Sequence, residues 1–369
     1  MIVRNIFGYD FVIDVPGGKD ITILQLSDLQ TIELSGIRND NRYGQIYNAF
    51  YTDGITDENI RVWRYVKEAV EKSNPDLIVL IGDNIYGETD EDGSQWLELC
   101  KQMDSYKIPW LVIFGNHDNE SAKGVRWQLE QIGKTKYGVI KQGNVTGNSN
   151  YTVGIRQDGE FKYTMYMLDT NGCKEYPFNP GEGIMSDNPD FKIIQQTQGI
   201  YPDQMKWMRE SNQKFIEVGI EVPALVFMHI PVSEAKDALR ELYPDTCENL
   251  PFYADREGDT GVAYEVFYDA CYTDGAFWKL SKEIGVTGMF FGHYHEVATS
   301  IVYDNIRLSF GLKTSADAGH HRNLLGALAI VLGEADGALS VKYLYSDLVY
   351  QTEFHVRSDE RATIAKDRE

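Results

Sequence analysis

Short apolar runs that each stop at a polar residue are the main pattern along this chain. Five of these runs have the length of a buried strand, and each is followed by a side chain that can bind a metal. The runs cover residues 21–27, 77–82, 110–115, 224–228 and 286–291, and the residues that follow are Asp28, Asp83, Asn116 with His117, His229, and Gly292 with His293 and His295. Ligands bind beyond the carboxyl ends of strands in open α/β sheets, so we expect these side chains to gather at one edge of a sheet.

Amphipathic segments between the runs predict helices. Residues 57–73 place apolar side chains on one face and end at Asn74-Pro75, residues 96–103 repeat the pattern, and Pro202 opens a third helix. The alternation of strands and helices predicts right-handed parallel crossovers. A second sheet and a closing meander are predicted from apolar segments at 151–155, 161–168, 297–303, 306–310, 324–332 and 339–344.

We expect residues 1–356 to form one domain, because a boundary between Asp28 and His295 would divide the set of candidate ligands. Three inserts interrupt the regular pattern and are predicted to be long loops, of which the last, 242–274, is either a substrate-facing lid or a surface excursion. They lie near residues 31–56, 170–201 and 242–274. Residues 357–369 form a charged C-terminal tail that we expect to be frayed.

Composition narrows the classes of partner. The chain has 369 residues with 35 Lys and Arg against 56 Asp and Glu, a formal net charge of -21. This charge repels nucleic-acid backbones and anionic membranes and disfavours non-specific nucleic-acid binding. Phosphate esters remain possible substrates if bound cations reverse the field locally. The oligomeric state stays open.

Targeting and redox signals are weak. The four cysteines are widely spaced and form no Cys-x-x-Cys pair, so a zinc-finger or thioredoxin-like interpretation has no support. The first 20 residues lack the apolar core of a signal peptide, and no later run approaches membrane-spanning length. We expect a soluble and most simply cytoplasmic protein, although a removed signal would leave the same appearance.

Each candidate ligand has an ordinary alternative when it is taken singly. Asp28 suits a turn, Asn116 suits a turn, and His229 suits a buried core. Four of the seven histidines nevertheless stand at these strand ends or next to them, where an unrelated distribution would scatter them. The joint pattern therefore favours a metal centre.

The order of these motifs resembles that of the calcineurin-like metallophosphoesterases over nearly the whole chain. The matching residues are Asp28, Gly82-Asp83, Gly115-Asn116-His117-Asp118, His229 and Gly292-His293-x-His295. Gly82-Asp83-Asn84-Ile85-Tyr86-Gly87 and Met228-His229-Ile230-Pro231 look most like the branch related to purple acid phosphatases. The resemblance implies an α/β fold of four layers, an α/β/β/α sandwich of two mixed sheets flanked by helices.

The resemblance also implies a role for each matching residue. Asp83 would bridge two metal ions, of which one is completed by Asp28 and His295 and the other by Asn116, His229 and His293. Phosphoric esters, with monoesters favoured, would then be hydrolysed by a metal-activated hydroxide. His117 would assist the leaving group or hold the phosphoryl oxygens, and Asp118 would orient an imidazole or a loop amide. Phosphodiester or pyrophosphate cleavage uses the same core.

One position departs from the family pattern. Gln30 stands where most members have a histidine, and a neutral amide is a poorer ligand for a transition metal. The chain is therefore either a degenerate metal-binding protein or an enzyme whose site is restored by another residue. Purple acid phosphatases also lack this histidine and use a tyrosine three residues after the bridging aspartate, where Tyr86 stands here. The alternative is that Tyr86 only packs near the site. A phenolate favours iron(III), so we expect iron(III) at Asp28, Asp83, Tyr86 and His295, with divalent iron, manganese or zinc at the other site.

Residues that touch the substrate are harder to predict. Gln30 lies within the first motif, and His320-His321-Arg322 follows the strands after His295, where a loop back over the metals would let it contact a phosphate. A turn with solvated basic side chains is an equal alternative for His320-His321-Arg322. A phosphorylated small molecule or another phosphoester is the expected substrate.

Overall fold

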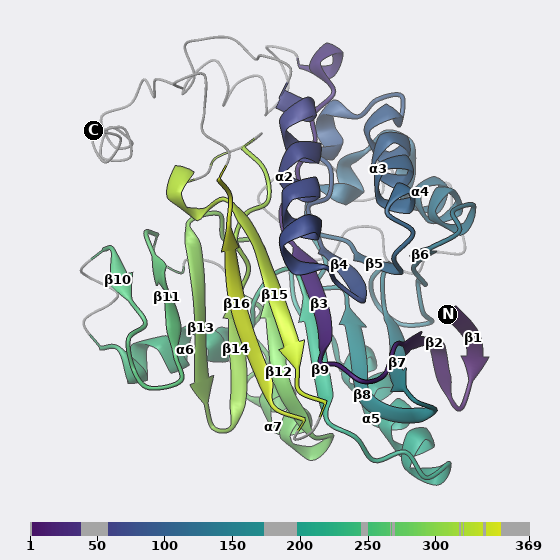
Figure 1. Cartoon of the computed structure of the whole chain (residues 1–369), viewed down its shortest axis with the longest axis vertical. Helices are drawn as coiled ribbons and strands as arrows, with labels where there is room; N and C mark the ends of the chain where they lie inside the picture. Colours follow the sequence, from purple (N-terminus) through teal and green to yellow (C-terminus); the bar gives the residue numbers. More distant parts are fainter. Residues whose placement is uncertain are drawn as a thin grey trace.

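A computed structural model describes residues 2–37, 58–172, 198–244, 250–265, 267, 270–316, 319, 321–334 and 337–347. Two mixed β-sheets pack face to face, and helices cover the outer face of each sheet (Figure 1). The predicted four-layer α/β/β/α sandwich is confirmed. The predicted inserts near 31–56 and 170–201 lie largely outside the described residues, and the tail 357–369 lies wholly outside them.

The smaller sheet has six strands in the order β16-β15-β3-β4-β5-β6. Its strands are β3 (Ile21–Leu26), β4 (Leu77–Ile81), β5 (Trp110–Ile113), β6 (Gly138–Val139), β15 (Gly326–Leu332) and β16 (Leu339–Tyr345). The neighbours β3, β4 and β5 pair in parallel, as the alternation of strands and helices predicts. Apolar faces of α2 (Glu58–Ser73), α3 (Ser94–Ser105) and α4 (Gly124–Gly133) pack against the outer face of this sheet.

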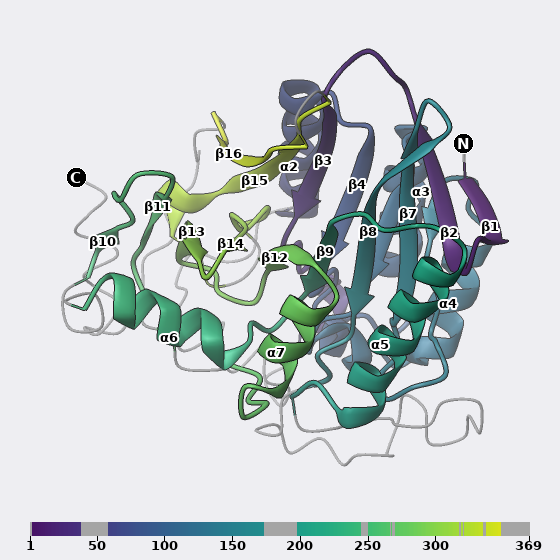
Figure 2. The same cartoon turned by 90° about the horizontal axis from the view of Figure 1, so that it is seen from below.

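The larger sheet has ten strands in the order β1-β2-β7-β8-β9-β12-β14-β13-β11-β10. Its strands are β1 (Ile2–Ile6), β2 (Tyr9–Val15), β7 (Tyr151–Gln157), β8 (Glu160–Leu168), β9 (Ala224–Met228), β10 (Phe252–Tyr253), β11 (Thr260–Ala263), β12 (Val286–Phe291), β13 (Val297–Tyr303) and β14 (Ile306–Phe310). Three helices cover its outer face, namely α5 (Pro202–Glu217), α6 (Ser233–Leu242) and α7 (Ala276–Glu283) (Figure 2).

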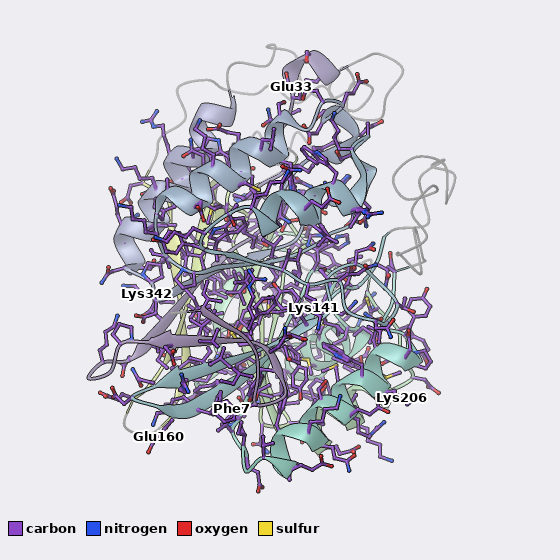
Figure 3. The ribbon with its side chains drawn as sticks, turned by 90° about the vertical axis from the view of Figure 1, so that its right-hand side faces the viewer. Phe7, Glu33, Lys141, Glu160, Lys206 and Lys342 are labelled. Atoms are coloured by element: carbon purple, nitrogen blue, oxygen red, sulfur yellow. The ribbon has the colours of Figure 1, made fainter. Side chains whose placement is uncertain are left out.

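The inner faces of the two sheets form a continuous apolar core. Side chains from β3, β4 and β5, among them Ile23 and Ile81, meet side chains from β8, β9 and β12, among them Met167, Phe227 and Phe290. Charged side chains lie outside, as Glu160, Lys206 and Lys342 do in the side view (Figure 3). Close-packed interiors deform little, so this core fixes the distance between the strand ends of one sheet and those of the other.

Several elements are not indicated by the sequence pattern. The hairpin β1–β2 joins the larger sheet through parallel pairing of β2 with the distant β7. Strands β10 and β11 lie inside the insert 242–274 and extend the sheet beyond β13, so the described part of this insert is more than a loop. Such pairing depends on tertiary contacts that local periodicity does not report. None of the helices within the described ranges is both long and apolar enough to cross a membrane.

Candidate metal centre

The candidate ligands follow strands of both sheets. Asp28, Asp83 and Asn116 follow β3, β4 and β5 in the smaller sheet, whereas His229 and the histidines after Gly292 follow the parallel neighbours β9 and β12 in the larger sheet. The expectation of a single sheet edge is therefore wrong. Each sheet contributes part of the set, and the packing of the two sheets brings the parts together.

Two carboxylates and an imidazole form the middle of the centre. His229 Nε2 lies 3.3 Å from Asp83 Oδ2 and 3.9 Å from Asp28 Oδ1. His295 Nε2 lies 3.4 Å from the same Asp28 oxygen. One ligand atom from each of Asp28, Asp83 and His229 lies within 4.8 Å of the others, and all three residues are buried.

These atoms fit a metal ion. Asp28 Oδ1 and His229 Nε2 are buried and have no hydrogen-bond partner within the part of the chain that the structure describes. A buried polar atom without a partner costs free energy, so something is expected to complete this arrangement. Carboxylate oxygens and imidazole nitrogens are together a donor set suited to iron, manganese or zinc.

The other predicted ligands lie beside this group. His293 Nδ1 is 3.1 Å from Asn116 Oδ1, and the His293 and His229 rings meet edge to face with centroids 5.2 Å apart. Asn116, His229 and His293 thus lie close together, and His295 lies beside Asp28. His229 also lies near both Asp28 and Asp83.

Strained backbone turns aim these side chains. Asp28, Asp83 and His293 have φ angles of 52°, 49° and 71°, in the left-handed region that residues other than glycine rarely adopt. Such residues persist only where the surroundings hold them and are common at functional sites. Here the turns after β3 and β4 hold each other, because the N–H of Asp28 donates to the carbonyl oxygen of Gly82.

Two motif glycines permit the close approach of the turns. A Cβ atom at Gly82, whose φ is 99°, would lie 2.6 Å from His229 Nδ1. A Cβ atom at Gly115 would lie 2.2 Å from Asp83 Oδ1. Both distances are shorter than any real contact, so glycine is required wherever the aspartate and histidine must lie this close.

The charges around His229 raise its pKa. Burial acts to lower the pKa of His229, but the carboxylates of Asp83 and Asp28 outweigh burial and raise it to about 9. Burial likewise opposes ionisation of the two aspartates, yet the charge of His229 lowers the pKa of both. His229 is therefore protonated in the metal-free centre, and a metal ion that binds its ring nitrogen must displace this proton.

His117 faces the centre with one ring nitrogen. Its Nδ1 lies 2.8 Å from Glu120 Oε2, and its Nε2 lies 3.9 Å from Asp83 Oδ2. Its backbone N–H donates to Asp83 Oδ1 at 2.8 Å. Glu120 was missed at the sequence level, although its position three residues after His117, in a short turn of 3₁₀-helix from Asp118 to Glu120, is the spacing that brings two side chains together.

Asp118 joins the turns after β4 and β5. Its carboxylate accepts hydrogen bonds from the backbone N–H groups of Asn84, Ile85 and Gly115 at 2.9, 3.1 and 2.7 Å. Burial, followed by the charge of Asp83, raises the pKa of Asp118 to about 7. The geometry assigns Asp118 to holding loop amides in place.

The comparison with protein families decides the identity of the fold. Residues 21–297 match the family model described as calcineurin-like phosphoesterase. The chain belongs to this family. The matched region contains all of the candidate ligands from Asp28 to His295.

The curated relatives of this chain are distant. Two come from Arabidopsis thaliana, "Probable inactive purple acid phosphatase 28", 26% identical over 48% of this chain and 47% of that protein, and "Probable inactive purple acid phosphatase 14", 25% identical over 63% and 56%. "Phosphatase DCR2" from Saccharomyces cerevisiae is 27% identical over 49% of this chain and 30% of that protein. The chain spans about half the length, or less, of these relatives.

The chain has a buried lysine beside its first motif. Lys313 Nζ donates to Gln30 Oε1 at 2.8 Å and to the carbonyl oxygen of Asp28 at 2.7 Å, and Gln30 Nε2 donates to Asp83 Oδ2 at 3.2 Å. Burial, and next the charge of Lys313, lowers the pKa of His295. Lys313 follows β14 as the ligands follow their strands, but a cation does not match a search for metal ligands.

Tyr86 lies beside His117, and Gly319, next to the proposed substrate contacts, lies beside His295. The buried ring of Tyr86 stacks on that of His117 with centroids 4.3 Å apart. His321 is buried and stacks on Tyr264 at 3.9 Å, and His295 Nδ1 bonds to the carbonyl oxygen of Gly319, so this segment passes close to the centre. His320 and the side chain of Arg322 lie outside the described residues.

Proposed function

We propose that this calcineurin-like phosphoesterase hydrolyses phosphoric esters with two bound metal ions, and that phosphomonoesters are its preferred substrates. The observation that carries the proposal is the meeting of Asp28, Asp83 and His229 between the sheets, with buried ligand atoms left without hydrogen-bond partners in the described part of the chain. Such a group, in a member of this family, fits the retention of metal ions.

The ligand assignment follows the two sides of Asp83. Asp83 would bridge the ions, Asp28 and His295 would hold one with Tyr86, and Asn116, His229 and His293 would hold the other. When bound, the ions supply positive charge to a phosphoryl group and acidify water. A phenolate ligand favours iron(III), so the Tyr86 side is proposed to hold iron(III) and the other side divalent iron, manganese or zinc.

His117 is proposed to protonate the departing oxygen of the substrate. Its Nε2 faces the centre, and Glu120 holds the opposite nitrogen at 2.8 Å, which fixes the ring. An alkoxide leaves more readily when it receives a proton, and an imidazole held by a carboxylate suits that task near neutral pH. Asp118 supports this arrangement by fixing the turns on either side of Asp83.

Metal analysis combined with a substrate panel tests the proposal. We expect two metal ions per chain and faster hydrolysis of aryl phosphate monoesters than of diesters or pyrophosphate. Faster diester or pyrophosphate cleavage would redirect the assignment to those substrates. Iron-loaded protein should absorb visible light through the phenolate, and Tyr86→Phe should abolish this band. A colourless iron protein would contradict the Tyr86 assignment.

Gln30 favours a second candidate, a metal-binding protein without turnover. The residue replaces the usual histidine, and two of the relatives are named as probable inactive phosphatases. His117→Asn separates the candidates. An enzyme loses rate and keeps its metals, whereas fully loaded protein that hydrolyses no mono- or diester with several added metals would support the second candidate.

A further inference from the structure

Gln30 and Lys313 form a buried, hydrogen-bonded pair at the first motif. Lys313 is 1% exposed, and its ammonium donates to Gln30 and to the main chain of Asp28, one of the proposed ligands. A buried ammonium is costly unless its hydrogens are accepted, so these bonds fix its position. Lys313 joins the pair to Asp28, and Gln30 joins it to Asp83.

The lysine determines which end of the Gln30 amide faces the centre. An ammonium has three donors and no acceptor, so the amide oxygen must face Lys313. The amide NH₂ then points to Asp83 Oδ2, at 3.2 Å. If the amide were turned over, its NH₂ would face the ammonium of Lys313 and its oxygen would face the carboxylate of Asp83. Neither contact could form a hydrogen bond, so the amide keeps this orientation. An amide NH₂ has no lone pair to offer a metal.

We infer that Gln30 and Lys313 make the metal site of Asp28 and His295 the weaker of the two sites, because they direct a hydrogen-bond donor and a fixed positive charge toward it. The inference rests on the proposed function and deepens it. The ion held by Asn116, His229 and His293 would stay bound, while its neighbour would exchange with the solution. Turnover would then follow the free metal concentration.

The other contacts of this site agree with the inference. Lys313 Nζ lies 2.7 Å from the carbonyl oxygen of Asp28, so the ammonium is close enough to act on an ion that Asp28 holds. A phenolate from Tyr86 would offset part of this charge. The inference concerns the relative affinity of the two sites for the same divalent ion, such as Mn²⁺.

Manganese binding to Gln30→Glu provides the test. Glutamate keeps the shape of Gln30 and an acceptor for Lys313, but it turns an oxygen instead of NH₂ toward the site. Full-length protein is stripped with a chelator and titrated with Mn²⁺ by calorimetry. For the unaltered protein we expect two classes of site whose Kd values differ by about 10-fold or more, and for Gln30→Glu a second Kd about 10-fold tighter with the first unchanged.

Two further variants control for indirect effects. Lys313→Met keeps the length of the side chain, removes the charge and frees Gln30 to turn its oxygen inward, so it should tighten the second site as well. Gln30→Met removes the donor without adding a ligand and should leave the second site weak. Circular dichroism and the Tm with and without Mn²⁺ establish folding. Metal should raise the Tm of Gln30→Glu more than that of the unaltered protein, because the introduced carboxylate faces the carboxylate of Asp83 when no metal lies between them.

The inference fails if the unaltered protein binds two Mn²⁺ with equal affinity. It also fails if folded Gln30→Glu and Lys313→Met both leave the second Kd unchanged. The proposed function fails separately: two unequal sites in a protein without phosphoesterase activity would keep the inference and remove the enzyme. Hydrolysis by a protein with two sites of equal affinity would support the proposed function and contradict the inference.

Discussion

The two sides of the metal centre are built by the same rule and differ in what surrounds them. On one side, Asn116, His229 and His293 contribute an amide and two imidazoles that lie against one another. On the other, Asp28 and His295 share their space with the amide of Gln30 and the ammonium of Lys313. Both sides receive their residues from strand ends. A strand end can thus supply a cation as readily as a ligand, and we infer that this difference sets the relative metal affinity of the two sides.

The largest effect is expected where the two sides meet. Asp83→Asn removes the charge that both ions share, so we expect loss of both metals and a fall in phosphoesterase rate on the order of 1000-fold. Metal analysis and rates on an aryl phosphate measure this. Asp158→Asn, in an exposed turn with a similar φ of 52°, is the matched control and should change neither. A fully loaded Asp83→Asn protein would contradict the bridging role.

His117 belongs to neither side, and its removal should separate chemistry from metal binding. We expect His117→Asn to lower the rate about 100- to 10,000-fold while both metals stay bound. Glu120→Gln should lower it less, because the ring keeps a hydrogen bond and loses only the charge that holds it. Metal loss from His117→Asn, or an unchanged rate, would count against the assignment.

Replacing one histidine on each side tests the asymmetry directly. His229→Gln should weaken the tight site about 100-fold, whereas His295→Gln should remove the weaker ion and leave one metal per chain. Equilibrium dialysis against Mn²⁺ distinguishes the two outcomes. Equal losses from both variants would mean that the sides are equivalent.

The smallest effect is a pH dependence confined to one side. The pKa of His229 is raised to about 9, so protonation stabilises the metal-free fold fully below pH 6.5, and this contribution, about 3 kcal/mol, is lost as the pH rises through 9. Metal must displace the proton, so affinity at this side should rise about tenfold per pH unit up to pH 9. His295, whose pKa is lowered, adds no such dependence near neutral pH. Metal titrations at pH 6, 7 and 8 test this prediction. A metal affinity at the His229 side that does not change with pH would contradict it.

The fold class and the candidate ligands could be predicted from the sequence for a physical reason. Buried parallel strands appear as unbroken apolar runs, so their ends can be recognised directly, and the residues at those ends include Asp28, Asp83 and His229. The sequence did not reveal Lys313, which stands at an equivalent strand end but has no ligand chemistry. It also did not reveal Glu120, whose contact with His117 depends on one turn of 3₁₀-helix.

The local sequence pattern also did not show that the candidate ligands come from two different sheets. Apolar runs show where a strand ends and do not show which strands pair. The packing of the sheet that contains β9 against the sheet that contains β3 brings His229 within 3.9 Å of Asp28. The stacking of His321 on Tyr264 is a similar tertiary contact.

This division constrains how the protein matures. The smaller sheet provides Asp28, Asp83 and Asn116 early in synthesis, but the histidines arrive only with β9 and β12, after most of the chain has left the ribosome. A nascent chain therefore lacks the nitrogen donors from β9 and β12 that favour a transition metal over magnesium or calcium. Metal selection is left to the finished fold, and we expect chains truncated before β12 to emerge without a selective site.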